Sequence, residues 1–160
     1  MEKMKTINVA GPLLVAVVLT TSFWAMADEN VPLNKLPAAV QTTLKQIAGN
    51  NKLEGCDAEV ANGKATYEAD FKVKGSDCSV TLNEAGDVLE RVLDAPLNIV
   101  PTMVLEAAQK AHPGGKFGES EIHNKDGRLF YVLEVHAGAD TFDVSLDAGG
   151  KVIADEKDMD

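Results

Sequence analysis

Residues 80–88 read VTLNEAGDV and residues 144–152 read VSLDAGGKV, two closely similar strand-turn-strand patterns. They lie 64 residues apart, the distance from Val80 to Val144, and the same offset aligns a longer stretch without a gap. Eleven positions between residues 33 and 88 are identical at this offset, whereas ordinary residue usage gives about three or four. These positions are Leu33, Asn34, Pro37, Val40, Lys52, Gly63, Tyr67, Val80, Leu82, Gly86 and Val88. The sequence therefore predicts one structural unit that occurs twice.

Each predicted unit begins with a short amphipathic helix. Its apolar residues recur at three- and four-residue steps, which places them on one helix face. They are Leu36, Val40, Leu44 and Ile47 in the first unit, and Val100, Val104, Ala108 and Ala111 in the second. Pro37 and Pro101 suit the first turn, where a missing N–H costs no helical hydrogen bond. Residues 49–50 and 112–114 predict the two helix ends.

Antiparallel strands are predicted to follow each helix. Asn62-Gly63 and Asp126-Gly127 are residue pairs that accept positive φ in a two-residue hairpin turn. Counting outward from these turns predicts the side chains that face the helices, because strand residues alternate between faces. These are Cys56, Ala58, Val60, Ala65, Tyr67, Ala69, Phe71, Cys78, Val80 and Leu82 in the first unit, and Ile122, Leu129, Tyr131, Leu133, Val135, Phe142, Val144 and Leu146 in the second. We therefore expect an α+β fold of two tandem helix-plus-antiparallel-meander repeats, residues 28–93 and 97–160, joined by a linker at residues 94–96. This linker is too short for the repeats to move independently, so we expect them either to dock or to continue one sheet.

The pattern resembles a known domain family. A helix that opens with Leu-x-x-(Leu/Val)-Pro-x-x-Val, and a meander that ends in Val-x-Leu-(Asn/Asp)-x-x-Gly-x-Val, is similar to PepSY-like domains, which are grouped with β-lactamase-inhibitor-like proteins. The pattern occupies residues 33–40 with 80–88, and again residues 97–104 with 144–152. The resemblance implies an exported tandem domain from a group associated with binding or inhibition of secreted hydrolases. Its motifs are structural positions, so no catalytic residue is implied.

Residues 1–27 predict a signal peptide. Lys3 and Lys5 precede an apolar run, and Ala25-Met26-Ala27 supplies the small-x-small cleavage pattern. An uncleaved anchor is the alternative, although the run is short for a bilayer span and no cysteine follows it as a lipid attachment point. We expect a periplasmic or secreted monomer that does not contact the membrane after cleavage.

The predicted mature chain, from Asp28 onward, is strongly acidic. It has 13 basic and 24 acidic residues and a net charge of −11, compared with −10 for the full sequence. Such a charge opposes binding to nucleic acid, whose phosphates need Lys and Arg. It favours cationic partners, or it serves solubility alone.

Cys56 and Cys78 both lie in the predicted exported part. Two thiols in an oxidising compartment normally pair, and a loop of 22 residues, the distance from Cys56 to Cys78, corresponds to about 3 kcal/mol in the chain-entropy model. The expected register puts them on one face but on the first and third strands, so the bond needs a bulge or a curled sheet edge. We expect a structural disulfide between them.

The predicted mature sequence lacks the residue patterns typical of catalytic and metal sites. Its serines lie in no Gly-x-Ser-x-Gly elbow and its three histidines have no zinc-type spacing, so we expect no enzymatic activity and no cofactor. His112 ends a helix, where a cationic ring suits the helix dipole. Asp143 and Asp147 could attract calcium, but the Asp-x-Asp-x-Asp-Gly loop is absent and a solvated acidic face is the simpler interpretation.

The predicted outer sheet faces, which point away from the helices, differ between the two units. The first carries Asp57, Glu59, Thr66, Glu68, Asp70 and Lys72, and the second carries Glu121, His123, Phe130, Val132, Glu134 and His136. Phe130 and Val132 are apolar where an antiparallel sheet normally meets water. They predict either a contact surface or a patch covered by the other unit, the linker or the tail.

The leading hypothesis is an exported protein-binding module, an inhibitor or regulator of a secreted hydrolase, that recognises an unidentified envelope or secreted protein. The residues expected to bind the partner are Phe130, Val132, His123, His136 and Glu134. The alternative is a periplasmic small-ligand or cation-binding protein that uses carboxylates and His136.

Overall fold

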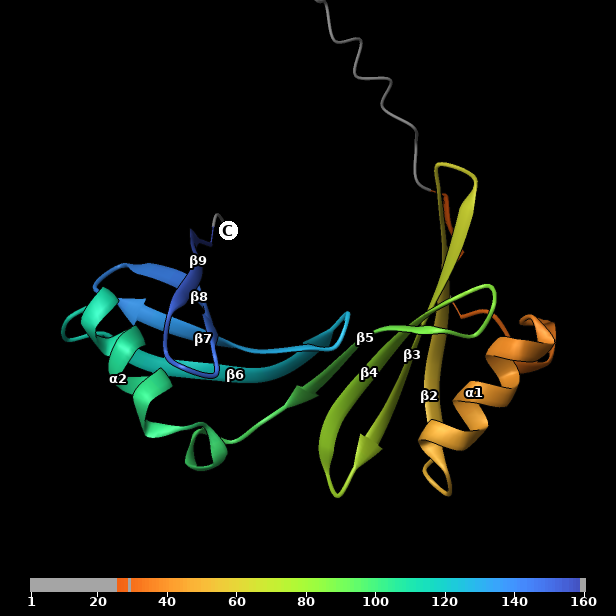
Figure 1. The fold of residues 1–160 in the computed structure, drawn as a ribbon, viewed down its shortest axis with the longest axis horizontal. Coiled ribbons are helices and arrows are strands. Elements are labelled where there is room, and N and C mark those ends of the chain that lie inside the picture. Colours follow the sequence, from red (N-terminus) through yellow and green to blue (C-terminus); the bar gives the residue numbers. More distant parts are fainter. Residues whose placement is uncertain (1–25, 29, 159–160) are drawn as a thin grey trace, which may run out of the picture.

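A single antiparallel sheet with two short helices makes up the computed structural model, which describes residues 26–28 and 30–158 (Figure 1). Nine strands pair in chain order, each with its neighbours in the sequence. The strands are β1 (Met26–Asp28), β2 (Leu53–Ala61), β3 (Lys64–Val73), β4 (Ser76–Asn83), β5 (Val88–Asp94), β6 (Lys116–Lys125), β7 (Arg128–Ala137), β8 (Asp140–Asp147) and β9 (Val152–Lys157). The helices are α1 (Ala38–Ala48) and α2 (Thr102–Ala111), preceded by the 3₁₀ turns η1 (Leu33–Lys35) and η2 (Leu97–Ile99).

The predicted signal peptide lies outside the described residues apart from residues 26–27, which belong to β1, and it stays a prediction. None of the helices in the described part of the chain has the length and hydrophobicity needed to cross a membrane.

Turn residues explain why the chain forms a meander. Asn62 and Gly63 both adopt positive φ, 54° and 72°, and Asp126 and Gly127 do the same at 49° and 74°. Two such residues form a hairpin turn whose twist matches that of the flanking strands. The predicted hairpins and their register are confirmed, since Ala58 pairs with Tyr67 and Ile122 pairs with Tyr131.

The helices lie on the sheet because two turn glycines allow close approach. Gly86 has a φ of 81°, and a Cβ placed there would lie 2.9 Å from the carbonyl oxygen of Ala39 in α1. Gly150 has a φ of 79°, and a Cβ there would lie 2.7 Å from the Met103 carbonyl oxygen in α2. Thr43 Oγ1 also donates a hydrogen bond of 2.9 Å to the Gly86 carbonyl. Both glycines therefore serve a left-handed conformation and a backbone contact at once.

The apolar stripes of the helices form two hydrophobic clusters. One contains Leu36, Val40, Leu44, Ala48, Cys56, Ala69, Phe71, Val80 and Leu82. The other contains Val100, Val104, Ala108, Tyr131, Leu133, Val135, Val144 and Leu146. Leu44 and Leu133 are fully buried, and burial of such a side chain contributes about 1.5–3 kcal/mol.

The predicted fold class, two tandem helix-plus-meander repeats, is wrong. Strand β5 pairs with β6 from Glu90 opposite Lys125 to Asp94 opposite Glu121, so one meander runs through the whole sheet. Just after β5, the Ala95 N–H donates a 2.8 Å hydrogen bond to the Ser120 carbonyl. Backbone pairing therefore continues beside the predicted linker at residues 94–96, and the two units continue one sheet. The fold is mostly β, with two short helices.

The predicted disulfide is also wrong, because Cys56 and Cys78 are both free thiols. Cys56 pairs with Ala69 and Cys78 pairs with Phe71, so β3 lies between the two cysteine strands. Two strand spacings amount to about 9.6 Å, beyond the Cα separation of about 4.4–6.8 Å that a disulfide spans. Burial raises the pKa of Cys56 to about 11 and also raises the pKa of Cys78, which keeps both thiols protonated.

Candidate functional site

The sheet has one face that the helices leave open. Buried residues of the helix-packed clusters, such as Phe71 and Tyr131, belong to a row that also includes Cys78, Leu93 and Ile122. Side chains alternate across a strand, so the intervening residues point to the opposite side, here called the outer face. One row on it consists of Asp70, Ser79, Val92, His123, Phe130 and Asp147, from β3 to β8.

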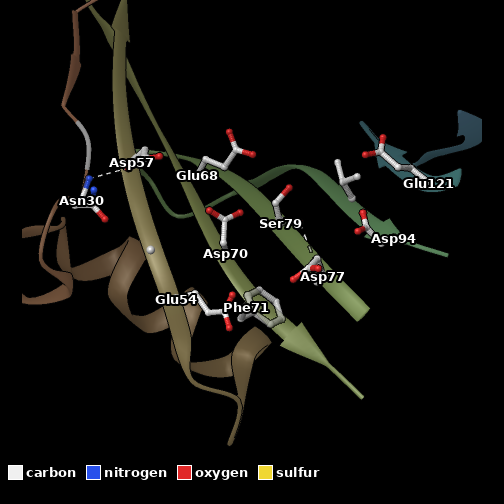
Figure 2. Close-up of a pocket in the computed structure, with 13 residues that line it drawn as sticks. Asn30, Glu54, Asp57, Glu68, Asp70, Phe71, Asp77, Ser79, Asp94 and Glu121 are labelled. Atoms are coloured by element: carbon white, nitrogen blue, oxygen red, sulfur yellow. Dashed lines mark hydrogen bonds between the residues drawn. The ribbon is translucent and has the colours of Figure 1, made fainter. Parts of the chain in front are cut away.

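The outer face of the amino-terminal half contains an acidic hollow of about 580 Å³ (Figure 2). Seven carboxylates from five neighbouring strands line it. They are Glu54 and Asp57 on β2, Glu68 and Asp70 on β3, Asp77 on β4, Asp94 on β5, and Glu121 on β6. Lys72 forms an ion pair with Asp77 beside them, and the backbone N–H of Asn30 donates to Asp57 at 2.7 Å. The β5–β6 pairing brings Glu121 into this group.

The carboxylates of the acidic hollow perturb one another. Burial, followed by repulsion from Asp57, Glu54 and Asp77, raises the pKa of Asp70. Burial and repulsion from Glu121 and Asp77 raise the pKa of Asp94. A cationic group that enters the hollow relieves this repulsion.

Metal-type clusters of three or more His, Cys, Asp or Glu are absent from the part of the chain that the structure describes. Asp147, a predicted calcium candidate, instead stabilises a turn. Its Oδ1 accepts hydrogen bonds of 2.9 Å from the backbone N–H groups of Gly149 and Lys151.

His123 joins the two halves of the outer face. Its Nδ1 lies 3.0 Å from Glu90 Oε1 on β5, and its Nε2 lies 2.8 Å from Glu121 Oε2 on β6. A neutral imidazole has one N–H, so only the protonated ring donates to both carboxylates. The ring also stacks on Phe130 with a centroid distance of 4.8 Å.

The pKa values around His123 shift in the directions that this arrangement requires. The hydrogen bond to Glu121, together with the bond to Glu90, raises the pKa of His123 despite burial. The bond from His123 lowers the pKa of Glu121. Burial acts to raise the pKa of Glu90, but hydrogen bonds from Lys125 and His123 outweigh it and lower that pKa.

The predicted partner-binding residues all lie on the outer face but form two groups. His123 stacks on the half-buried Phe130, and Val132 is the next outer-face residue along β7. His136 and Glu134 lie farther along the same strand, with His136 Nε2 2.8 Å from Glu134 Oε1. The two histidines are not brought together. His112, at the end of α2, binds Asp155 at 2.9 Å and stacks on Phe142.

Sequence reasoning missed the contributions of β4 and β5 to the acidic hollow. Asp77 and Asp94 lie on the outer face, and Glu90 forms a hydrogen bond with His123. Alternation along these two strands was the available signal, but the pairing of β5 with β6 had no local mark in the sequence.

A second hollow, of about 770 Å³, lies at the β6–β7 and β8–β9 turns, next to Phe130 of the outer face, and is here called the basic-rimmed hollow. Its lining residues are Lys125, Asp126, Arg128, Leu129, Phe130, Asp147, Ala148, Gly149 and Ile153. Phe130 therefore stacks with His123 and also lines this hollow.

Comparison with known proteins identifies the fold. No protein-family model and no curated protein matches the sequence. A BLIP-like protein from Bacteroides fragilis matches with a TM-score of 0.63 at 19% identity, covering 81% of this chain and 91% of that one. A DUF2874 family protein from Bacteroides uniformis matches with a TM-score of 0.64 at 20% identity, covering 76% and 88%. A protein from Bacteroides eggerthii, described as periplasmic, matches with a TM-score of 0.64 at 18% identity over the same shares.

These similarities show a BLIP-like fold. This confirms the β-lactamase-inhibitor-like part of the resemblance, whereas its PepSY-like part stays a prediction. The predicted periplasmic or secreted location agrees with the description of the Bacteroides eggerthii protein.

Proposed function

We propose that this chain is an exported protein-binding module whose outer face binds a basic envelope or secreted protein. The observation that carries the proposal is the acidic hollow, in which seven carboxylates from five strands line an open sheet face. The proposal includes no catalytic step and no cofactor.

The extent of the outer face supports a protein partner. The row from Asp70 to Asp147 crosses six strands, which corresponds to about 24 Å at the usual strand spacing. A surface of this width suits a standard protein interface, which buries about 800 Å² on each partner. Phe130 and Val132 lie within it and supply apolar contact, the kind of anchor that interfaces favour.

Charge complementarity supports a basic partner. Repulsion within the hollow raises the pKa values of Asp70 and Asp94 beyond the effect of burial, so lysine or arginine side chains from a partner stabilise the ionised carboxylates. Complementary charge also speeds association, and this effect decreases with salt.

The location and the narrower role rest on other observations. The predicted signal peptide and the neighbour described as periplasmic support an exported protein. The fold shared with a BLIP-like protein supports the narrower form of the proposal, in which the partner is a secreted hydrolase that the module inhibits or regulates.

Affinity capture tests the proposal. A tagged chain spanning residues 28–160 is used to capture proteins from an envelope and secreted-protein extract of the source organism. We expect a stoichiometric basic partner that is lost in the variant Asp70→Asn/Asp94→Asn and weakened by Phe130→Ala. The matched control Glu84→Gln/Glu106→Gln removes the same charge at exposed positions outside the hollow and retains the partner. Recovery of the chain alone, or equal loss in the control, contradicts the proposal.

A further inference from the structure

The basic-rimmed hollow differs from the acidic hollow in its apolar exposure. Six large apolar side chains are exposed in the described part of the chain: Val60, Ile99, Met103, Leu129, Val152 and Ile153. Two of them line this hollow, Leu129 at 44% exposure and Ile153 at 59%, and Val152 is the neighbour of Ile153. Leu129 and Ile153 therefore give this hollow exposed apolar surface, and Phe130 and Ala148 complete its wall.

The charges around the hollow leave one cation available. Lys125 on β6 and Arg128 on β7 occupy opposite register positions at the rim. Lys125 Nζ forms an ion pair with Glu90 Oε2 at 2.8 Å. Arg128 is exposed and forms no ion pair with any other described residue. Two carboxylates also line the hollow: Asp147 Oδ1 accepts hydrogen bonds from turn amides, and the Asp126 carboxylate lies in the hairpin turn next to Lys125.

We propose that the basic-rimmed hollow binds a small organic acid that has an apolar body. The body contacts Leu129, Phe130 and Ile153, and the carboxylate pairs with the Arg128 guanidinium, whose planar fork matches two carboxylate oxygens. A volume of about 770 Å³ lies within the range of about 300–1,000 Å³ that is usual for small-molecule sites.

The same face directs the anion to this hollow. The acidic hollow repels a carboxylate, so the ligand is confined to the carboxy-terminal end of the outer face. Binding here needs no protein partner, and the proposal therefore stands or falls separately from the proposed function.

Titration of the chain spanning residues 28–160 with octanoate tests the proposal. We expect amide chemical-shift changes in ¹⁵N-resolved NMR that centre on Phe130 and Ile153. Octanol, which has the apolar body without the charge, should bind more weakly. Arg128→Gln should weaken octanoate binding about threefold to fivefold at low salt, as expected for an exposed ion pair, and should leave octanol binding unchanged.

Arg91→Gln is the matched control, because Arg91 is exposed but pairs with Val80 on the helix-side face. It removes the same charge and should leave octanoate binding intact. Shift changes that centre elsewhere, equal binding of octanol and octanoate, or equal weakening by Arg91→Gln overturns the proposal. So does a concentration-dependent dimer that Ile153→Ser abolishes while octanoate produces no shift, since the hollow is then an interface between two copies.

Discussion

The two halves of the sheet are alike on the side that faces the helices and different on the outer face. Val80 and Leu82 in one half, and Val144 and Leu146 in the other, are fully buried under α1 and α2. The outer face of the amino-terminal half carries the acidic hollow, whereas that of the carboxy-terminal half carries Phe130 and Val132 and ends at the basic-rimmed hollow. Packing restricts the residues on the helix-facing side, because truncation of a buried side chain is strongly destabilising. On the outer face, which is in contact with water, most substitutions change stability little. Differences on the outer face are therefore free to serve binding.

The exceptions on the helix side are also informative. Ser120 occupies the position that corresponds to Cys56, and its Oγ donates to the Ala95 carbonyl. Phe142 corresponds to Cys78 and stacks on His112 with a centroid distance of 4.1 Å. One backbone arrangement thus accepts a thiol, a hydroxyl or an aromatic ring, provided that each polar group finds a partner.

The largest effect should come from Leu44→Ala, which tests whether the two halves unfold together. Leu44 is fully buried against the first cluster, and its truncation should lower the free energy of unfolding by about 2–5 kcal/mol. Because β5 pairs with β6, the amides near Leu44 and those near Leu133 should lose structure at the same, lowered urea concentration in NMR. Ile99→Ala, at a residue that is 52% exposed, should change the free energy by less than about 0.5 kcal/mol. A shift confined to amides near Leu44 would show two independent units.

Local features of the sequence predicted much of the fold. The turn pairs Asn62-Gly63 and Asp126-Gly127 predicted two hairpins. Counting outward from these turns placed Tyr67 and Tyr131 in the correct register. The three- and four-residue spacing of Val40 and Leu44 located a buried helix face. Each of these signals acts over a few residues, through turn geometry or side-chain period.

Long-range pairing could not be predicted in the same way. Strand β5 pairs with β6 from Glu90–Asp94 to residues 121–125, although no hairpin turn connects these two strands. Only the folded sheet therefore shows that Glu121 and Asp94 line the same hollow. The wrong disulfide had another cause: the sequence placed Cys56 and Cys78 on the first and third strands, but the expected redox compartment favoured a bond that the width of β3 prevents. On the outer face, Phe130 was identified, but its stacking on His123 and its place at the edge of a hollow were not.

A smaller effect on stability should follow from loss of the His123 cluster, here meaning His123 with its hydrogen-bond partners Glu90 and Glu121. This cluster has no counterpart in the amino-terminal half. The folded pKa of His123 lies above its unfolded value, so its contribution is complete below about pH 6.5 and is lost as pH rises through the folded pKa. The folded pKa values of Glu90 and Glu121 are lowered, so their contribution is present above their ordinary value of 4.5 and is lost as pH falls through the folded values. The His123 cluster should therefore stabilise the folded state most between about pH 4.5 and 6.5.

Urea unfolding of wild type and His123→Gln at pH 5.5 and pH 8.5 measures this contribution. His123→Gln should cost about 1–2 kcal/mol at pH 5.5 and less at pH 8.5, because the charged hydrogen bonds exist only while the ring is protonated. The control is His136→Gln, whose ring also pairs with a carboxylate but is 50% exposed and should show little effect at either pH. An equal cost of His123→Gln at both pH values would show that the ring contributes packing alone.

The smallest effect on stability should come from adding a reducing agent. This test concerns Cys78, whose counterpart in the carboxy-terminal half is the aromatic residue Phe142. Both cysteines are free, so reduction of protein purified from an oxidising compartment should change the free energy of unfolding by less than about 0.5 kcal/mol. A disulfide in this loop would instead contribute about 3 kcal/mol. Alkylation of the urea-unfolded, unreduced protein should label two thiols. In the native state labelling should be slow, because a Cys56 pKa of about 11 leaves about 0.1% thiolate at pH 8. A loss of stability on reduction would require the strand that carries Phe71 to leave its place between the two cysteines, and so would contradict the pairing of β2, β3 and β4.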